Sequence, residues 1–453
     1  MNYTCNSAHA QQQFIQAQRP KFNCLNTFNL LTGDLLFDEV ERLMPEHRER
    51  LFPPTETLAM FVTQALSADR SCQQIVNQAA VQRLVNGLPG CSTHTGGYCR
   101  ARNRLPLNMV MGLSCYLGRA IDRQTPESWR WHGRKVKLVD GTTVTMADTP
   151  ANQAAFPQQC QQKPGLGFPI CRILGITCLS SGALLDAAVC RFNGKGGDER
   201  TLLRSLQETL DSGDILIGDA LFPTYFFVAS MQEKGIDILM EQQGPRRRST
   251  DFRCGKKLGQ RDHLIVIKKP RAKPDWMSDK AYQKAPESIT VREFKAGGKI
   301  MVTTMTNPKD ACKKELQMLY RQRWSVELDI RDIKETMGMD ILSCKSPDMA
   351  LKEIWVHFLA YNLIRLLMMQ SALKAGILTR EISFKHCLQL WLIWQQAADP
   401  YDENKFHALC LLIAQQRVGN RPGRIEPRAV KRRPKTYLSL MVPRHHARPA
   451  YYP

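Results

Sequence analysis

The segment from residue 135 to residue 240 limits the fold of this chain more than any other. Its apolar residues form short β-branched runs and then recur at three- and four-residue spacing between further apolar runs. This pattern predicts three strands followed by helix, strand, helix and strand, at 135–139, 172–179, 183–192, 198–210, 214–218, 225–234 and 236–240. Such an order is typical of an α/β domain with a mixed sheet.

The flanking segments predict further units around this core. Helical spacing near the N-terminus predicts a small helical domain over residues 1–118. Helical periodicity is lost over 244–307, where three short apolar runs predict an inserted β-rich module. Helix resumes at residue 311. The remaining units are therefore expected to be an α/β domain over 127–243 and 308–345, a C-terminal helical region over 346–416, and a Pro- and Arg-rich tail over 417–453.

The charge balance narrows the choice of partners. The chain has 63 Lys and Arg against 42 Asp and Glu, a net charge of +21, and nucleic acid is the usual partner of a soluble protein this basic. Residues 417–453 hold 10 of these cations and 1 acid, so 10 − 1 = +9 lies in the tail. Two roles remain open for this tail: a nonspecific DNA or assembly element, or a solubilising segment.

Cysteine usage and hydropathy indicate in which cellular compartment the protein functions. The 15 cysteines are odd in number and form no CxxC pair, which favours reduced thiols over a disulfide framework. Residues 1–18 are polar and Gln-rich, unlike a signal peptide. The most apolar stretch, 354–378, includes His357, Asn362 and Arg365, too many polar groups for a helix in lipid. We therefore expect a cytoplasmic, nucleoid-associated protein without a membrane partner.

Basic residues in the N-terminal region suggest a contact with phosphate. Arg100, Arg102 and Arg104 recur at every second position beside Tyr98, an arrangement that suits a DNA backbone. A solvated basic turn would give the same pattern, so both interpretations remain open. If the first is right, this helical domain recognises a DNA sequence separately from the α/β core.

Two aspartates follow predicted strands of the core. Asp140 comes after the run 135–139, and Asp219 comes after the run 214–218. Ligands usually bind where strands end at the carboxyl edge of a sheet. Asp-Gly is also a common turn pair, and Asp219 could cap the next helix. Taken singly, each aspartate is thus better explained by a structural role.

The helix predicted from residue 311 to residue 338 adds a second polar group of residues. On an ideal helix, one sector of about 60° carries four reactive side chains: Tyr320, Arg323, Glu327 and Lys334. The neighbouring sector is apolar, as expected for a core face: it holds Leu319, Val326, Ile330, Ile333 and Met337. We call the four reactive residues the polar stripe. A solvated helix face is the alternative.

The spacing Tyr320-x2-Arg323-x3-Glu327-x6-Lys334 matches the YREK motif of DDE transposases in family four of the bacterial insertion-sequence elements. The segment Val139-Asp-Gly-Thr-Thr143 resembles the family's first-Asp strand, and Ile217-Gly-Asp-Ala-Leu-Phe222 resembles its second. The resemblance covers residues 35–395. It implies a ribonuclease H-like sheet into which the β-rich module is inserted.

The resemblance also implies a mechanism. Asp140, Asp219 and Glu327 would hold two divalent ions, Mg²⁺ or in its place Mn²⁺, for in-line displacement at a phosphodiester. Tyr320, Arg323 and Lys334 would hold phosphates of the element's end. The implied route is cut and paste through a hairpin, on terminal inverted repeats and target DNA. It implies a homodimer in a synaptic complex, with the helices after Leu351 as candidate dimer contacts. Their apolar faces fit a core within the chain equally well.

Two positions differ from relatives of this family. Ala220 stands where many carry a basic residue, and the module lacks the late Trp on which better-known relatives stack a flipped base. Trp276 is the only Trp in the module. Two other classes of function remain: a catalytically silent DNA-binding regulator derived from a transposase, and another ribonuclease H-like nuclease such as a resolvase or repair enzyme.

Overall fold

The computed structural model describes residues 52–85, 87, 90–194, 197–397 and 402–419, together with residues 39, 42, 43, 442, 446 and 447. Most of the predicted basic tail therefore lies outside the described residues, as does the beginning of the N-terminal domain. Every cysteine in the described ranges is a free thiol. Within the same ranges, no helix is both long enough and apolar enough to cross a membrane.

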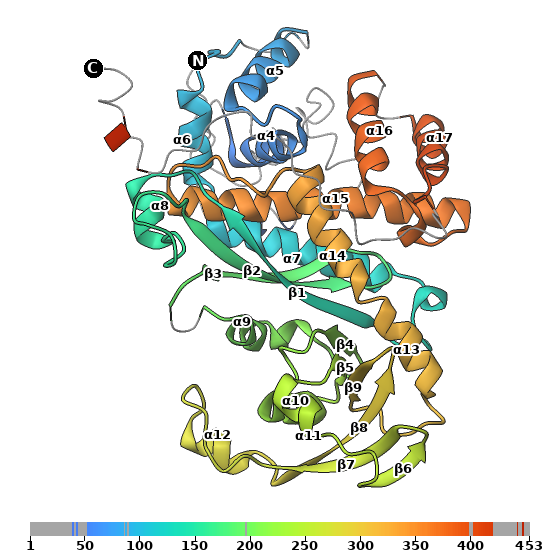
Figure 1. Ribbon diagram of the computed structural model, residues 1–453. Helices are drawn as coiled ribbons and strands as arrows, with labels where there is room; N and C mark the ends of the chain where they lie inside the picture. The colour runs from blue at the N-terminus through green and yellow to red at the C-terminus, as the bar shows by residue number, and fades with distance from the viewer. Residues whose placement is uncertain are drawn as a thin grey trace.

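A nine-stranded mixed sheet forms the centre of the molecule, in the order β3-β2-β1-β4-β5-β9-β8-β7-β6 (Figure 1). The strands are β1 (Val136–Thr145), β2 (Ile170–Cys178), β3 (Leu184–Arg191), β4 (Ile215–Gly218), β5 (Asp237–Glu241), β6 (Lys256–Gly259), β7 (Asp262–Lys268), β8 (Ser288–Ala296) and β9 (Lys299–Thr303). β1, β2 and β3 are antiparallel neighbours, whereas β1, β4 and β5 are parallel. The predicted α/β class with a mixed sheet is confirmed.

Strand β1 is longer than predicted. It pairs with β2 from Lys137 opposite Cys178 to Thr145 opposite Ile170. Its second half is rich in β-branched residues, which suit a pleated, half-buried surface. The pairing therefore carries the strand through Asp140. The expectation that Asp140 follows the end of a strand is wrong, because the Asp-Gly pair lies within β1 and makes no turn.

The predicted β-rich module belongs to the same sheet. β9 pairs antiparallel with β5, and β8, β7 and β6 continue outward from it. The module also contains two short helices, α11 (Gly244–Ser249) and α12 (Asp279–Lys284). The sequence did not predict them, because a helix of 6 residues is too short to show a helical period.

Helices pack on both faces of the central strands. Val139 of β1 lies in one core with α9 (Glu199–Ser205) and α10 (Tyr225–Glu233), whereas Leu138 faces the other side of the sheet. That other side is covered by α13 (Lys313–Arg321), α14 (Trp324–Arg331) and the π-turn η4 (Asp332–Thr336). Packing from two sides fixes the position of β1 and β4, where the predicted site residues lie.

Helix α15 (Pro347–Ala375) crosses the molecule on the β3 side of the sheet, packed among the N-terminal helices (Figure 1). These helices are α4 (Pro54–Leu66), α5 (Cys72–Val85), α6 (Gly96–Arg104) and α7 (Leu107–Gln124). Nearly the whole length of α15 is buried, against α4, α7, β3 and α17 (Glu403–Ala414). Its buried apolar residues therefore form core within this chain, which was the alternative to dimer contacts for this helix.

A glycine ends α15 within the predicted C-terminal helical region. Gly376 has a φ of 65°, the left-handed conformation that commonly follows the last turn of a helix. The chain then forms α16 (Phe384–Ala397) and α17. The helical region predicted over 346–416 therefore consists of several separate helices.

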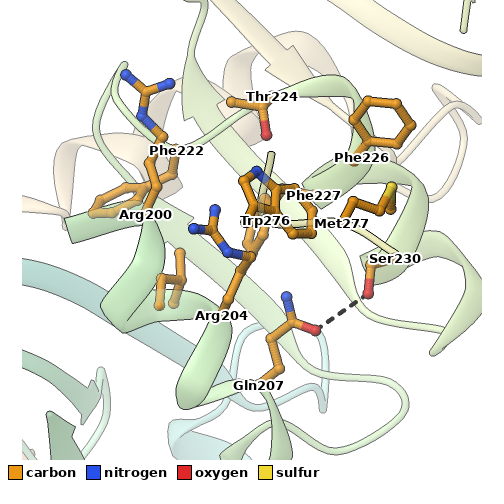
Figure 2. Close-up of a pocket in the computed structure, with 11 residues that line it drawn as sticks. Arg200, Arg204, Gln207, Phe222, Thr224, Phe226, Phe227, Ser230, Trp276 and Met277 are labelled. Carbon is orange, nitrogen blue, oxygen red and sulfur yellow. Dashed lines mark hydrogen bonds between the residues drawn. The ribbon is translucent and has the colours of Figure 1, made fainter. Parts of the chain in front are cut away.

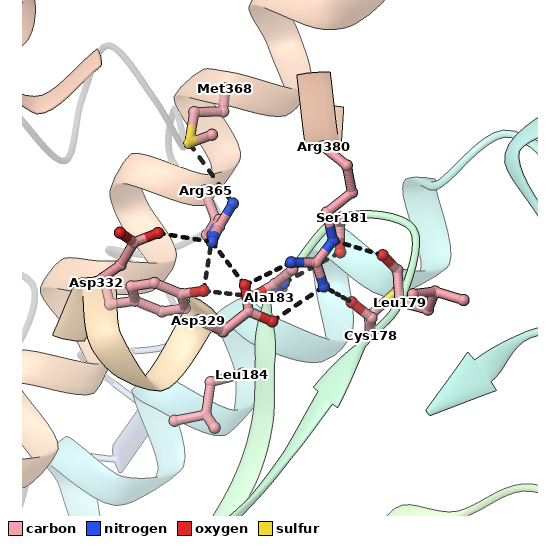
Figure 3. Close-up of polar contacts among 12 residues, drawn as sticks. Cys178, Leu179, Ser181, Ala183, Leu184, Asp329, Asp332, Arg365, Met368 and Arg380 are labelled. Atoms are coloured by element: carbon pink, nitrogen blue, oxygen red, sulfur yellow. Dashed lines mark hydrogen bonds and ion pairs between the residues drawn. The ribbon is translucent and has the colours of Figure 1, made fainter. Parts of the chain in front are cut away.

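A buried cluster of ion pairs holds α14 against the rest of the chain (Figure 3). Asp329 has no exposed surface and accepts hydrogen bonds from Arg365 at 2.7 Å and from Arg380 at 2.5 Å. Arg380 also donates to the Leu179 carbonyl, just beyond β2, at 2.7 Å. Removing one partner would leave a charge buried without compensation. The cluster therefore fixes the orientation of α14, which carries Glu327.

We expect the stability of the chain to respond to the protonation of Asp332, which lies 3.3 Å from Arg365 in this cluster. Burial raises the pKa of Asp332 from 3.8 to about 6, with Asp329 adding to the rise and Arg365, Arg331 and Arg380 opposing it. The folded state therefore binds this proton more tightly than the unfolded chain does. The resulting stabilisation is lost as the pH rises from about 4 to about 6.

In the Asp332→Asn variant, the side chain at position 332 cannot ionise. The stability of this variant relative to the unmodified chain should therefore increase from about pH 4 to about pH 6 and level off at higher pH. Thermal unfolding midpoints, recorded for both proteins from about pH 4 to about pH 7, measure the difference. A difference that stays constant with pH would contradict the assignment.

Candidate active site

Asp140 and Asp219 stand at the same level of two parallel strands. The pairing of β1 with β4 places Leu138 opposite Ile217. Asp140 and Asp219 lie two residues further along, the first within β1 and the second directly after β4, as predicted for Asp219. Each carboxylate accepts a hydrogen bond of 2.8 Å from a backbone N–H just beyond it. Both acids thus lie at the same level of the sheet, where β4 ends beside the middle of β1.

Glu327 belongs to the same electrostatic group. Burial raises the pKa of Asp140, and the negative charges of Glu327 and Asp219 raise it further. The hydrogen bond from Gly141 and the positive charge of Arg323 act in the opposite direction. The structure therefore brings together the three carboxylates that the sequence identified at widely separated positions.

The helix that carries the polar stripe is not continuous, which corrects the prediction. Between α13 and α14, Arg323 N–H bonds to Tyr320 at 3.0 Å and Val326 N–H bonds to Arg323 at 3.1 Å, both across three residues. Further on, η4 widens into a π-turn. The angles of an ideal helix therefore do not apply, and the positions of the stripe residues depend on their tertiary contacts.

Arg323 lies between the carboxylates. Its guanidinium is 3.5 Å from Asp140 Oδ2 and donates to Glu327 Oε1 at 2.5 Å. Burial raises the pKa of Tyr320 to about 12, and the charge of Asp219 adds to this rise. Tyr320 is therefore neutral at physiological pH and can donate a hydrogen bond. Arg323 thus joins Glu327 to Asp140, and Tyr320 lies near enough to Asp219 to feel its charge.

Lys334 contacts β1 two and three residues beyond Asp140. Its Nζ donates to Thr142 Oγ1 at 3.2 Å and to the Thr143 carbonyl at 2.8 Å. The π-turn η4 places this lysine along the same strand as the first aspartate. The whole polar stripe therefore faces β1 and the end of β4, despite the break in the helix.

The structure separates the three N-terminal arginines. Residues 96–104 form α6, so alternate positions point to opposite sides. Arg100 and Arg104 are exposed. Arg102 is buried, with its guanidinium 4.7 Å from the Phe61 ring and 3.2 Å from Gln64 Oε1. The prediction that Arg102 contacts DNA is therefore wrong, because the helical period turns its side chain into the domain core.

Substitution of buried Arg102 should therefore affect mainly stability, whereas substitution of exposed Arg100 or Arg104 should affect mainly DNA binding. Arg102→Met should destabilise the chain by about 1–3 kcal/mol, because buried partners lose their hydrogen bonds. Arg100→Ala and Arg104→Ala should change stability by less than about 0.5 kcal/mol but weaken DNA binding. Thermal unfolding and fluorescence anisotropy with labelled duplex separate the two effects. Equal loss of stability in all three variants would count against this division.

A pocket lined in part by Phe222, three residues after Asp219, went unrecognised in the sequence (Figure 2). It has a volume of about 160 Å³ and is lined by Arg200, Arg204, Phe222, Phe226 and Trp276, among others. Arg204 lies 4.2 Å from the centre of the Trp276 ring, and Trp276 is 49% exposed. The spacing of Arg200 and Arg204 on one helix, beside the Asp219 segment, is the signal that could have revealed it.

Two aspartates at one level of adjoining strands, a helix-borne glutamate and the cations beside them form the arrangement that the resemblance to DDE transposases implies. The family model described as "Transposase DDE domain" matches residues 131–363. The chain is 27% identical over 426 residues to "Transposase InsG for insertion sequence element IS4" from Escherichia coli (strain K12), a match that spans 89% of this chain and 92% of that relative. The chain therefore belongs to the DDE transposases, within the group of the IS4 element.

A solved structure also matches the chain. It is described as "Cryo-EM structure of piggyBac transposase synaptic complex with hairpin DNA", with a TM-score of 0.45 and 10% identity. The match spans 91% of this chain and 88% of that one.

Proposed function

We propose that this transposase excises and inserts its element by a cut-and-paste route, with a hairpin intermediate and divalent metal ions. The observation that carries the proposal is the placement of Asp140 and Asp219 on adjoining parallel strands beneath Glu327. The strand order β3-β2-β1-β4-β5, antiparallel and then parallel, supports a ribonuclease H-like core for this chemistry.

The donor chemistry of the site fits Mg²⁺, with Mn²⁺ as a substitute. Asp140, Asp219 and Glu327 offer only carboxylate oxygens, the ligands that hard divalent ions prefer. Among the described residues, no three acidic, His or Cys side chains converge as a metal site. This agrees with the position of Arg323 between Asp140 and Glu327. When bound, two such ions would activate the attacking oxygen and stabilise the leaving one.

The cations of the polar stripe would position the DNA. Arg323 can present a bidentate fork to a phosphate, whereas Lys334 acts as a point charge. Their contacts with Asp140 and with β1 hold both beside the carboxylates. Tyr320, neutral at physiological pH, can donate to a phosphate oxygen. We therefore propose that these three residues align the scissile phosphate rather than bind the metal.

The partners follow from the same proposal. The N-terminal helices, through the exposed Arg100 and Arg104, would recognise the terminal inverted repeats. Exposed Arg247 and Arg248 of α11 can contact phosphates nearer the module. Two copies would bring two ends and the target DNA together, within the nucleoid of the cytoplasm.

The proposal can be tested with the full-length chain and linear DNA that carries the inverted repeats flanking its gene. With Mg²⁺, we expect a nick that frees a 3′ hydroxyl, followed by a hairpin at the element's end and transfer to target DNA. Denaturing gels with separately labelled strands resolve the products, and EDTA should abolish all of them. Binding to the repeats with no cleavage in Mg²⁺ or Mn²⁺ would support the silent regulator instead.

We further propose that the pocket of Trp276 accepts a base displaced from the duplex while the hairpin forms. An aromatic face and two arginines suit a base with its phosphate, and stacking of one base contributes about 1–3 kcal/mol. Trp276→Ala should therefore slow hairpin formation by about tenfold or more and leave the first nick unchanged. Time courses of both products provide the measurement, with the nick as internal control. Equal slowing of both steps would exclude this role.

A further inference from the structure

One glutamine organises the loop between α8 (Pro150–Ala155) and β2. The side-chain NH₂ of Gln158 donates to the carbonyls of Gln162 at 3.1 Å and Lys163 at 2.9 Å. Its Oε1 accepts hydrogen bonds from the backbone of Gly165 at 3.0 Å and Gly167 at 3.1 Å. Both donors and both lone pairs of the amide are thus used. They close residues 158–167 into one defined loop without helix or strand.

The base of this loop is fixed as well. Gln153 of α8 donates to the Gly167 carbonyl at 2.9 Å and accepts from Gln158 N–H at 3.1 Å. Asn193, just beyond β3, donates to the Gln158 carbonyl at 2.9 Å. A side chain at position 167 would collide with Gln158 and Gln162. The loop is therefore built to hold its tip in place, as binding loops on rigid scaffolds are.

The tip presents amide groups and a positive charge. Gln161, Gln162 and Lys163 are exposed. An open groove of about 610 Å³ lies between the loop and the start of α8, with Gln159 and Gln162 among its lining residues. Its only acidic lining residue, Asp148, is engaged by Gln153 at 2.9 Å. Amide side chains pair with base edges, most often adenine, and Lys pairs with phosphate.

The loop stands in line with the active site. From Asp140, β1 continues to Thr145, a distance of about 17 Å along the strand. The chain then enters the segment before α8, at the left-hand end of the sheet in Figure 1. Lys334 lies over the middle of this path. The Lys345 carbonyl accepts from Thr149 at 2.9 Å near its end, and the Lys345 side chain is exposed. Cations thus follow β1 from the carboxylates to the loop.

We infer that the loop of residues 158–167 is a second DNA-reading element, which contacts base edges of the element's end through Gln161 and Gln162. Lys163 and Lys345 contact the adjoining phosphates. The inference rests on the proposed function, since it assigns a duplex to this surface. It divides recognition between the N-terminal helices and the catalytic core, so that the bases near the scissile phosphate are read by the core itself.

Selection from a library of random duplexes by the full-length chain tests the inference. The unmodified protein should enrich a motif. The double variant Gln161→Ala and Gln162→Ala should lose preference at a few consecutive positions, by about tenfold per contacted base, and keep the rest of the motif. Lys163→Ala and Lys345→Ala should keep the motif but weaken binding to every duplex. Gln389→Ala and Lys385→Ala, at exposed positions of α16, are matched controls and should change neither.

The outcomes separate failure of the inference from failure of the proposed function. If the unmodified chain enriches no motif and binds duplex without salt dependence, the proposed function itself fails. If it enriches a motif that the glutamine double variant reproduces in full, with unchanged affinity, the loop does not read DNA and the inference is overturned.

Discussion

Replacing Asp140, Asp219 or Glu327 with its amide is expected to abolish strand cleavage and transfer while DNA binding survives. Loss of a group that merely supports a metal ligand costs up to about a hundredfold in activity, so loss of a ligand should cost more. Asp140→Asn, Asp219→Asn and Glu327→Gln keep the size of each side chain but remove its charge. Nicking, hairpin formation and transfer should all fail together, because one site would serve every step.

The measurement combines rates of product formation with binding of labelled ends. Titration of Mn²⁺ by calorimetry should show weaker binding in the same variants. Glu335→Gln is a matched control, since Glu335 is exposed on η4, the π-turn that follows α14. Cleavage by Glu327→Gln at the rate of the unmodified chain would mean that the polar stripe is only a solvated helix face.

Removing the guanidinium of Arg323 should separate metal binding from catalysis. Misplacement of a reacting group can cost about a hundredfold in rate, so Arg323→Ala should form little hairpin or transfer product. The Mn²⁺ affinity of this variant should stay the same or increase. In the unmodified chain the guanidinium pairs with Asp140 and Glu327, and without it nothing competes with the ion for these carboxylates. Lys334→Ala should lose rate similarly, without the gain in affinity, because Lys334 contacts Thr142 and Thr143 rather than a carboxylate.

Single-turnover cleavage and calorimetric Mn²⁺ titration give the two readouts. Arg331→Ala is the control, since Arg331 is an exposed arginine at the end of the same helix. A marked loss of Mn²⁺ affinity in Arg323→Ala would contradict the assignment of Arg323 as a competitor of the metal. It would favour a structural role in which the guanidinium keeps Asp140 and Glu327 in position.

Local patterns predicted the order of elements well, and failed where pairing or packing decided the outcome. Strand period and helical period depend on neighbouring residues, so the strands and the longer helices from residue 135 to residue 240 could be found from the sequence, whereas α8, with 6 residues, could not. The extension of β1 through Asp140 depends on β2, which pairs along its whole second half. The alternation of Arg100, Arg102 and Arg104 suggested a shared surface, yet the helix turned Arg102 into the core.

The sequence by itself determined the α/β order, the basic character and the spacing of the reactive residues, and this spacing carried the resemblance to DDE transposases. These features lie in residue type and local period, which the chain keeps in any conformation. Only the tertiary structure decided that Arg323 stands between Asp140 and Glu327, and that Arg365 and Arg380 fix α14 through Asp329. Those contacts join segments far apart in the chain, and their geometry depends on packing that no local period contains.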